Sequence, residues 1–131
     1  MEHVLFFDGN TKKISWVIQT NNSIIEQKRE HADIYLDKVT SHQSKYIGLH
    51  VGIFCGIGTF IIKNQDIVKI AISDKTMFEH LSSNQKSFDE FIEKRTYFIR
   101  QLIEQRKLKI QYELITQDKN LAAKKIQCNG A

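Results

Sequence analysis

The chain has 131 residues, of which 41% are hydrophobic and 26% are charged, and it contains no proline. These values predict one globular domain over residues 1–131 with a core of its own, and the lack of proline excludes a Pro-rich linker. Lys and Arg outnumber Asp and Glu by 19 to 15, which gives a net charge of +4. This mildly basic balance is compatible with a nucleic-acid partner without being diagnostic of one.

The cysteines and the N-terminus bear on where the protein works. Cys55 and Cys128 lie in no metal-ligand spacing, and we interpret them as reduced thiols of a cytosolic protein. The first residues, Met1-Glu2-His3, lack the basic start and the long apolar core of a signal peptide. Both features predict a cytoplasmic location.

One uncharged run raises the alternative of a membrane helix. Residues 46–62 carry no charge and lie between Lys45 and Lys63, which is a pattern of membrane anchoring. The run is, however, at the lower limit of length for crossing a bilayer, and it contains His50. We therefore interpret it as a helix that can lie very close to a sheet, because glycines recur in it at every fourth position: Gly48, Gly52 and Gly56.

The first apolar run, Val4-Leu5-Phe6-Phe7, has no polar face and therefore predicts a strand buried on both sides at the centre of a sheet. It ends on Asp8-Gly9-Asn10, so the Asp8 carboxylate follows a core strand and points out of the core. Such a carboxylate can hold a metal or face a phosphate. The alternative is that Asp8 only begins the turn to the next strand.

Two further strands complete a predicted antiparallel meander within the first thirty residues. Ile14, Trp16 and Ile18 alternate with other residues at the period of a strand. Asn21-Asn22 is a hairpin signal, and residues 23–29 then form the returning strand. The polar end of this strand suits the edge of a sheet.

The glycine-rich helix follows a connection over residues 31–40. Thr40 or Ser41 can cap it. Residues 67–72 then predict a strand that ends on Ser73-Asp74, which places a second carboxylate after a core strand. The apolar positions of the helix have helical spacing and are Tyr46, Leu49, Ile53, Ile57, Phe60 and Ile61.

The last part of the chain predicts a short helix over Met77 to Leu81 and a long amphipathic helix over Ser87 to Lys107. A final strand over 109–115, a turn over 116–119 and a helix over 120–127 follow. The apolar stripe of the long helix consists of Phe88, Phe91, Ile92, Phe98, Ile99, Leu102 and Ile103.

This order of elements resembles the ribonuclease H fold. Four segments resemble motifs of that family, and together they span nearly the whole chain. The resemblance implies an α/β fold with a five-stranded mixed sheet, three antiparallel strands followed by two parallel ones, and helices on both faces. The four segments are Phe7-Asp8-Gly9-Asn10, Ser44 to Ile53, Ile72-Ser73-Asp74-Lys75, and Asn120-Leu121-Ala122-Ala123-Lys124.

The family cleaves the RNA strand of RNA–DNA hybrids with two divalent cations held by four carboxylates, a chemistry that needs paired hard cations and oxygen ligands. By the resemblance, Asp8 and Asp74 match the first and third of these catalytic carboxylates. Lys45 and Lys124 stand at the other two ligand positions. The histidine that many members place before the last helix is also missing, and Gln117-Asp118 stands there instead.

Two lysines at ligand positions repel a cation, so we expect a ribonuclease H-like pseudoenzyme that binds RNA–DNA hybrid or duplex on its former active face. Its cofactor would be none, or magnesium bound weakly by Asp8 and Asp74. Besides Lys45 and Lys124, the residues expected to contact phosphates are Lys12, Lys13 and Lys75.

Two alternatives stay open. The first is an active metal-dependent ribonuclease H that uses Asp8 and Asp74 with substitute ligands, such as Asp118 or Glu113 in another register. The second is a protein-interaction scaffold, because a fold does not fix a function.

Other polar residues have simpler interpretations. We expect His31, Asp33 and Asp37 in a solvated edge strand and loop, His50 as a satisfied core histidine and Cys55 as a small core residue.

One expectation concerns how two neighbouring carboxylates are stabilised without metal. We expect the Lys124 ammonium to lie beside Asp8 and Asp74 and to replace the metal charge, with Lys45 approaching from the main helix. The alternative is that both lysines extend into water.

Overall fold

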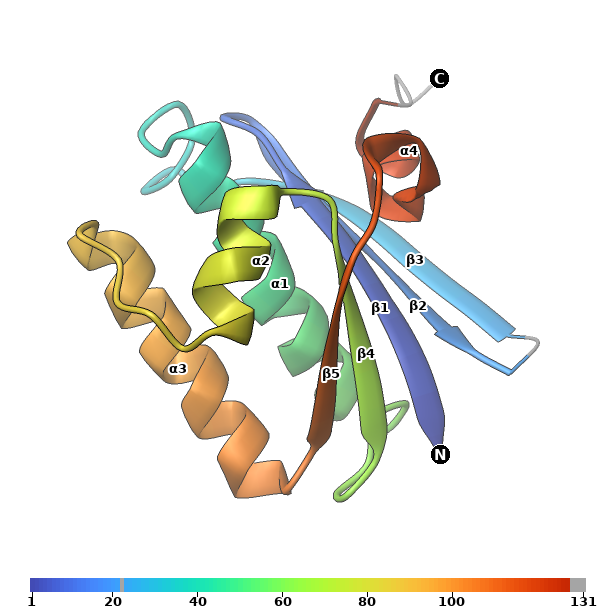
Figure 1. The fold of residues 1–131 in the computed structure, drawn as a ribbon. Coiled ribbons are helices and arrows are strands. Elements are labelled where there is room, and N and C mark those ends of the chain that lie inside the picture. Colours follow the sequence, from blue (N-terminus) through green and yellow to red (C-terminus); the bar gives the residue numbers. More distant parts are fainter. Residues whose placement is uncertain (22, 128–131) are drawn as a thin grey trace.

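A five-stranded mixed sheet forms the centre of the structure, a computed structural model that describes residues 1–21 and 23–127 (Figure 1). Asn22 and Cys128, both named above, lie outside the described residues. The strand order is β3-β2-β1-β4-β5. The β1–β2 and β2–β3 pairs are antiparallel, and the β1–β4 and β4–β5 pairs are parallel, as expected. The strands are β1 Glu2–Gly9, β2 Lys13–Thr20, β3 Ser23–Glu30, β4 Ile67–Ile72 and β5 Lys109–Leu114.

Strand β1 lies at the centre of the sheet because its apolar side chains are needed on both faces. Leu5 and Phe7 are buried on one face, and Val4 and Phe6 are half-buried on the other. The strand is paired on both sides, with β2 and with β4. By contrast, β3 forms an edge, and most of its side chains are exposed. The prediction of a central strand and a polar edge strand is confirmed, although Val4 and Phe6 are half-buried where burial on both faces was expected.

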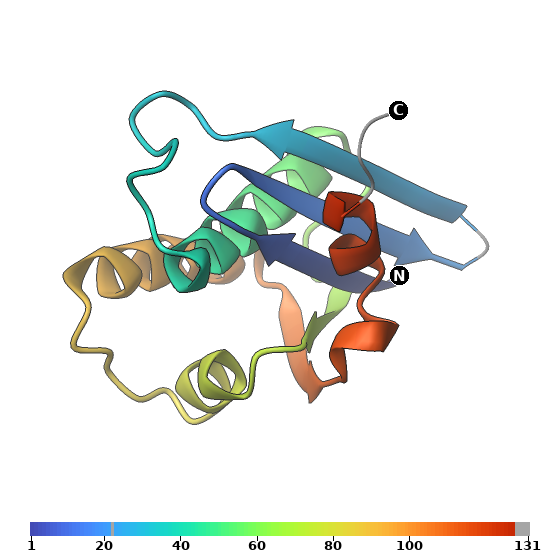
Figure 2. The ribbon, with the colours of Figure 1, turned by 90° about the horizontal axis from the view of Figure 1, so that it is seen from above.

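Helices α1, α2 and α3 lie on one side of the sheet and α4 lies on the other (Figure 1). Figure 2 shows the 31–40 connection beside the β1–β2 turn, where the Asp37 backbone N–H donates to the Thr11 carbonyl oxygen at 2.9 Å. No helix among the described residues is both long and apolar enough to span a membrane. The helices are α1 Ser41–Gly58, α2 Lys75–Ser82, α3 Glu90–Arg106 and α4 Leu121–Gln127, with a short 3₁₀ turn, η1, at Gln117–Lys119.

Side-chain caps fix where the helices begin. Thr40 and Gln43 form a reciprocal capping box at α1, with both hydrogen bonds at 3.0 Å. Asp89 accepts from the backbone N–H groups of Phe91 and Ile92 and starts α3. The predicted start of this helix at Ser87 was therefore wrong by one turn, and Phe88 lies outside the helix and is exposed.

Some apolar residues that the sequence assigned to the buried faces of α1 and α3 lie outside the helix or are exposed. α1 ends at Gly58, so Phe60 and Ile61 lie beyond it, and Phe60 is exposed. On α3 only Ile92, Thr96 and Ile99 are buried. Phe98, expected in the core, is 45% exposed.

Glycines bring α1 unusually close to the sheet. A Cβ on Gly48 would lie 2.7 Å from the Asp8 carbonyl oxygen, and a Cβ on Gly9 would lie 2.6 Å from the Ser44 carbonyl oxygen. Both neighbours are backbone atoms, which cannot move aside as a side chain can. The expected close packing of this helix is confirmed, and it places the first turn of α1 directly over the end of β1.

We expect Gly48→Ala to lower the free energy of unfolding by about 1–3 kcal/mol, because the new methyl group overpacks the contact with β1. Gly58→Ala is the matched control, since a Cβ there meets no atom within 4 Å. Alanine also favours a helix over glycine, so the control should be neutral or slightly stabilised. Urea unfolding measures both, and equal effects of the two substitutions would contradict the close contact.

Candidate functional site

The carboxyl ends of β1 and β4 meet at one edge of the sheet, because these central strands are parallel neighbours. Asp8 is the second-last residue of β1, and Asp74 follows β4 and caps α2. The first turn of α1 and the start of α4 lie at the same edge (Figure 1). Two carboxylates and two helix starts therefore gather there, and we call this edge the strand-end site.

Both oxygens of the Asp74 carboxylate have partners within the chain. Its Oδ1 accepts from the Met77 backbone N–H at 3.0 Å. Its Oδ2 lies 3.1 Å from His42 Nδ1 and 3.4 Å from Lys45 Nζ. Burial alone would raise the pKa of Asp74, but the Met77 N–H, Lys45 and His42 together hold this pKa below its ordinary value. Asp74 is thus an ionised helix cap with Lys45 as its counter-ion.

Asp8 is in the opposite situation, although it lies at the same edge. It is buried, and its Oδ1 accepts from the Gly9 backbone N–H at 2.9 Å. Burial raises the pKa of Asp8, and the Asp74 charge adds to the rise, against the opposing effects of Gly9, Lys45 and Gln117. The ionised form of Asp8 is therefore disfavoured by the fold.

The two lysines at this edge behave differently. Lys45, on α1, forms the ion pair with Asp74, as expected for a cation approaching from the main helix. Lys124, on α4, is exposed and forms no ion pair with any described carboxylate. The expected bridge from Lys124 to both carboxylates is not formed, and the Lys124 side chain is exposed to water instead.

Asn120 connects α4 with the ends of β1 and β4. In the sequence it stood out only as part of a motif. Its side chain is fully buried, and its Oδ1 accepts from the backbone N–H groups of Ala122 and Ala123 at 3.0 and 3.3 Å. Its Nδ2 donates to the Phe7 carbonyl oxygen and to Ser73 Oγ, both at 3.0 Å. One amide thus caps α4 and ties it to the ends of β1 and β4. The available sequence signal was the preference of Asn for helix N-caps.

Two histidines have roles that the sequence did not reveal. His42 contacts Asp74, and only its place in the first turn of α1 could have indicated this. His31 was expected in a solvated segment, but it is buried, and its Nε2 lies 2.7 Å from Ser44 Oγ and 3.1 Å from the Asn10 carbonyl oxygen. Burial lowers the pKa of His31 despite the Asn10 contact. Asp33 and Asp37 are exposed, as expected.

Comparisons with known proteins bear on the fold. No protein-family model and no curated protein matches the sequence. Solved structures do match. RNase H1 of the halophilic archaeon Halobacterium salinarum superposes with a TM-score of 0.78 at 13% identity, over 96% of this chain and 94% of that one. The N-terminal RNase H domain of a Mycobacterium tuberculosis protein gives 0.78 at 18% identity, over 96% and 95%.

A third neighbour was solved with nucleic acid. LC11-RNase H1, isolated from compost, in complex with an RNA/DNA hybrid gives a TM-score of 0.74 at 13% identity, over 95% of this chain and 92% of that one. The similarity covers nearly the full length of each chain. This chain has the ribonuclease H fold.

The donor set at the strand-end site does not fit the two-cation centre that this fold implies. Such a centre needs several oxygen ligands that are free to face the metals. Here Asp74 is engaged by a backbone N–H, a histidine and a lysine. Among residues 1–21 and 23–127, no group of three or more His, Cys, Asp or Glu side chains is placed to hold a metal ion.

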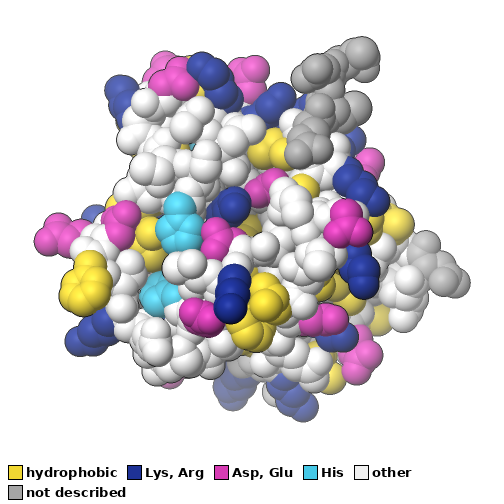
Figure 3. Space-filling model, turned by 45° about the horizontal axis from the view of Figure 1, so that its top comes forward, with side chains coloured by type: hydrophobic (Ala, Val, Ile, Leu, Met, Phe, Trp, Pro, Cys, Tyr) yellow, Lys and Arg dark blue, Asp and Glu magenta, His cyan; other side chains and the backbone are white. Residues whose placement is uncertain are grey.

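The lysines expected to contact phosphates lie in mixed charge surroundings. Lys75 is exposed, Lys13 is half-buried, and Lys12 is exposed and pairs with Asp37 at 2.9 Å. Figure 3 shows the face that contains the top of Figure 1, where Lys and Arg side chains are interspersed with acidic and His side chains. The face therefore offers single cations rather than a continuous basic band.

Opposite pKa shifts of the two carboxylates predict opposite effects of neutralising them. Asp8→Asn should stabilise the fold near about pH 7, because the raised pKa makes the ionised carboxyl unfavourable in the folded state. The gain should vanish as pH falls through that raised pKa toward the ordinary value of 3.8, below which Asp8 is neutral in both states.

Asp74→Asn should instead destabilise the fold near neutral pH by up to about 1 kcal/mol, because it removes the ion pair with Lys45 while an Asn cap remains. Its lowered pKa means that this loss disappears only when pH falls below the folded-state pKa of Asp74. Unfolding in urea across a pH series measures both variants. Two effects of the same sign at neutral pH would contradict the assigned environments.

Proposed function

We propose that this domain binds nucleic acid, an RNA–DNA hybrid or a duplex, on the face that contains the strand-end site, and that it lacks two-metal cleavage activity. The observation that carries the proposal is the Lys45–Asp74 ion pair at 3.4 Å. A carboxylate that the fold would otherwise offer to a metal already has a protein cation beside it. Any magnesium bound by Asp8 and Asp74 would have to compete with that cation and would bind weakly.

The comparisons support the nucleic-acid part of this proposal. LC11-RNase H1, which shares the fold along nearly its whole chain, was solved with an RNA/DNA hybrid. A shared fold does not by itself fix a function, so the argument also needs groups on this chain that can contact phosphates. Lys75 and Lys13 are such groups, and Lys12 can exchange its exposed partner Asp37 for a phosphate at little cost.

Binding of this kind depends on phosphate neutralisation and not on reading of bases. Its affinity should be modest, because acidic side chains are mixed with the lysines on the face in Figure 3. It should also weaken as salt rises, since each neutralised phosphate releases counter-ions. Sequence preference should be small.

The purified chain should not cleave an RNA–DNA hybrid above background with magnesium or manganese, because the lysine ion pair occupies Asp74. A labelled-hybrid assay measures this, with Asp8→Asn as the control for contaminating nuclease. Robust cleavage by the wild type that disappears in Asp8→Asn would overturn the proposal and favour the active-nuclease alternative. Lys45→Glu combined with Lys124→Asp should give metal binding by calorimetry, and no gain would contradict the assignment of these two positions.

Binding to hybrid or duplex should fall steeply with salt, with a slope of about −0.9 in log affinity per phosphate neutralised on duplex DNA. Lys12→Gln with Lys13→Gln should reduce that slope, because two phosphate contacts are lost. The matched control is Lys63→Gln with Lys109→Gln. These two exposed lysines lie near the amino ends of β4 and β5, at the opposite end of the strands from the strand-end site, and replacing them should leave the slope unchanged. No binding at about 50 mM salt would favour the protein-interaction alternative.

A further inference from the structure

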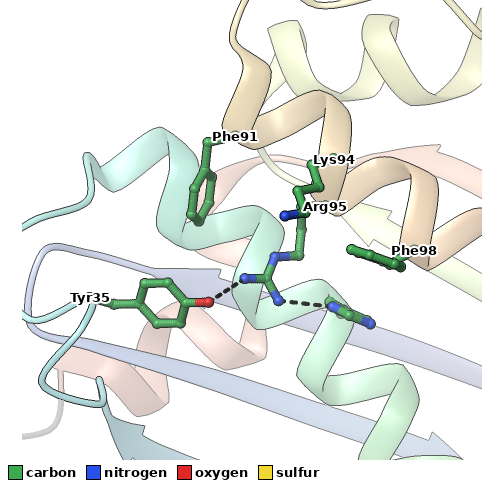
Figure 4. Close-up of a pocket in the computed structure, with 6 residues that line it drawn as sticks. Tyr35, Phe91, Lys94, Arg95 and Phe98 are labelled. Carbon is green, nitrogen blue, oxygen red and sulfur yellow. Dashed lines mark hydrogen bonds between the residues drawn. The ribbon is translucent and has the colours of Figure 1, made fainter.

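A second candidate site lies between α1, α3 and the 31–40 connection, and it shares no residue with the strand-end site. It is a cavity of about 490 Å³, which is within the size range of small-molecule sites. Figure 4 shows its side chains converging from these three segments. We call it the arginine pocket, and it is lined by Tyr35, His50, Phe91, Lys94, Arg95 and Phe98.

Arg95 is held in a fixed position at the centre of this pocket. One terminal nitrogen, Nη2, donates to the Tyr35 hydroxyl at 2.8 Å, and the other, Nη1, donates to His50 Nδ1 at 3.0 Å (Figure 4). The guanidinium also lies over the rings of Tyr35 and Phe91, at 5.6 and 5.4 Å from their centroids. A guanidinium carries five N–H groups, and these two hydrogen bonds use only two of them.

The positive charge of Arg95 has no acidic partner. The described residues that line the pocket include no Asp or Glu, and no described carboxylate forms an ion pair with Arg95. Because an arginine can only donate, His50 Nδ1 accepts and its proton lies on Nε2. Burial, and next the Arg95 charge, lower the pKa of His50, so this neighbour stays neutral. Lys94 adds a second cation to the lining, so the pocket carries positive charge without compensation.

Aromatic surface borders this charge. Tyr35 and Phe91 pack edge to face, with centroids 6.0 Å apart and planes at 87°, which fixes one wall. Phe98 lines another part of the pocket and is 45% exposed, although its place in the apolar pattern of α3 predicted burial. Phe98 therefore offers an accessible aromatic surface to a ligand in the same pocket that holds Arg95.

We propose that the arginine pocket binds a small molecule in which a planar ring is joined to a phosphate or carboxylate group. Arg95 and Lys94 hold the anionic group, and the aromatic side chains hold the ring. Both halves of the ligand are needed, because an ion pair with the exposed Lys94 is weak by itself and the ring surface is small. This inference is independent of the proposed nucleic-acid function, since it uses none of the residues assigned to that function.

The test is a titration followed by amide and arginine side-chain NMR resonances. AMP and phenyl phosphate are the probes that join a ring to a phosphate, while adenosine and inorganic phosphate each supply one half. At least one of the joined probes should shift the resonances of the pocket residues and bind about tenfold more tightly than its separate halves, a difference of about 1.4 kcal/mol. Adenosine as tight as AMP, phosphate as tight as both joined probes, or shifts confined to the strand-end site would overturn the proposal.

A charge reversal separates this binding from loss of folding. Lys94 is exposed, so Lys94→Glu should fold normally while placing a negative charge in the pocket lining that repels the anionic group of the ligand. Affinity for the joined probe should fall about tenfold or more. Lys109→Glu makes the same charge change at an exposed position on β5 and should leave binding unchanged. Equal effects of the two variants would mean that only net charge matters and would overturn the assigned site.

Discussion

The close approach of α1 to β1 is the constraint on which the rest of the structure depends. Gly48 lets the helix backbone rest against the Asp8 carbonyl, and Gly9 leaves room for the backbone of Ser44. A larger side chain at either position would push the helix away from the sheet. With the helix in place, its first turn lies over the carboxyl ends of the central strands. The Lys45 ammonium thereby comes within 3.4 Å of Asp74.

This geometry gives the two carboxylates of the strand-end site unequal environments. Asp74 caps a helix and has a lysine and a histidine beside it, so its charge is stabilised by the fold. Asp8 is buried next to that charge and is destabilised when ionised. Two carboxylates that served one metal pair would need to be ionised together. Here the Lys45 ammonium is nearer to Asp74, and burial destabilises the ionised form of Asp8.

Periodicity and turn residues predicted the individual strands, because these signals report local structure directly, and the resemblance to the ribonuclease H family implied the mixed sheet that the strands form. The resemblance also implied that Lys45 would approach the carboxylates, and its ion pair with Asp74 agrees with this expectation. The predictions from the sequence were wrong at positions where tertiary packing determines the structure. The start of α3 depends on which polar residue caps it, and Asp89 does so instead of Ser87. Phe98 fits the apolar pattern but faces the arginine pocket, because α3 packs on α1 along a narrower face than the pattern implies. The expected contact of Lys124 was wrong, because this side chain is exposed on α4 and forms no ion pair with a described carboxylate.

The two candidate sites differ in whether their central charged group already has an oppositely charged partner within the chain. This difference determines which ions each site can bind from solution. At the strand-end site the ionised carboxylate Asp74 already has a cation from its own chain. An external metal gains little there, because it must displace the lysine or tolerate its repulsion. In the arginine pocket the cation has only neutral hydrogen-bond partners among the described residues. An external anion meets no competing carboxylate there and gains from the low-dielectric walls. The chain carries a net charge of +4, so anions are also the ions that its overall field attracts. Of the two sites, the arginine pocket is therefore the one whose cation has no carboxylate partner among the described residues, as binding of the proposed ring-bearing anion requires.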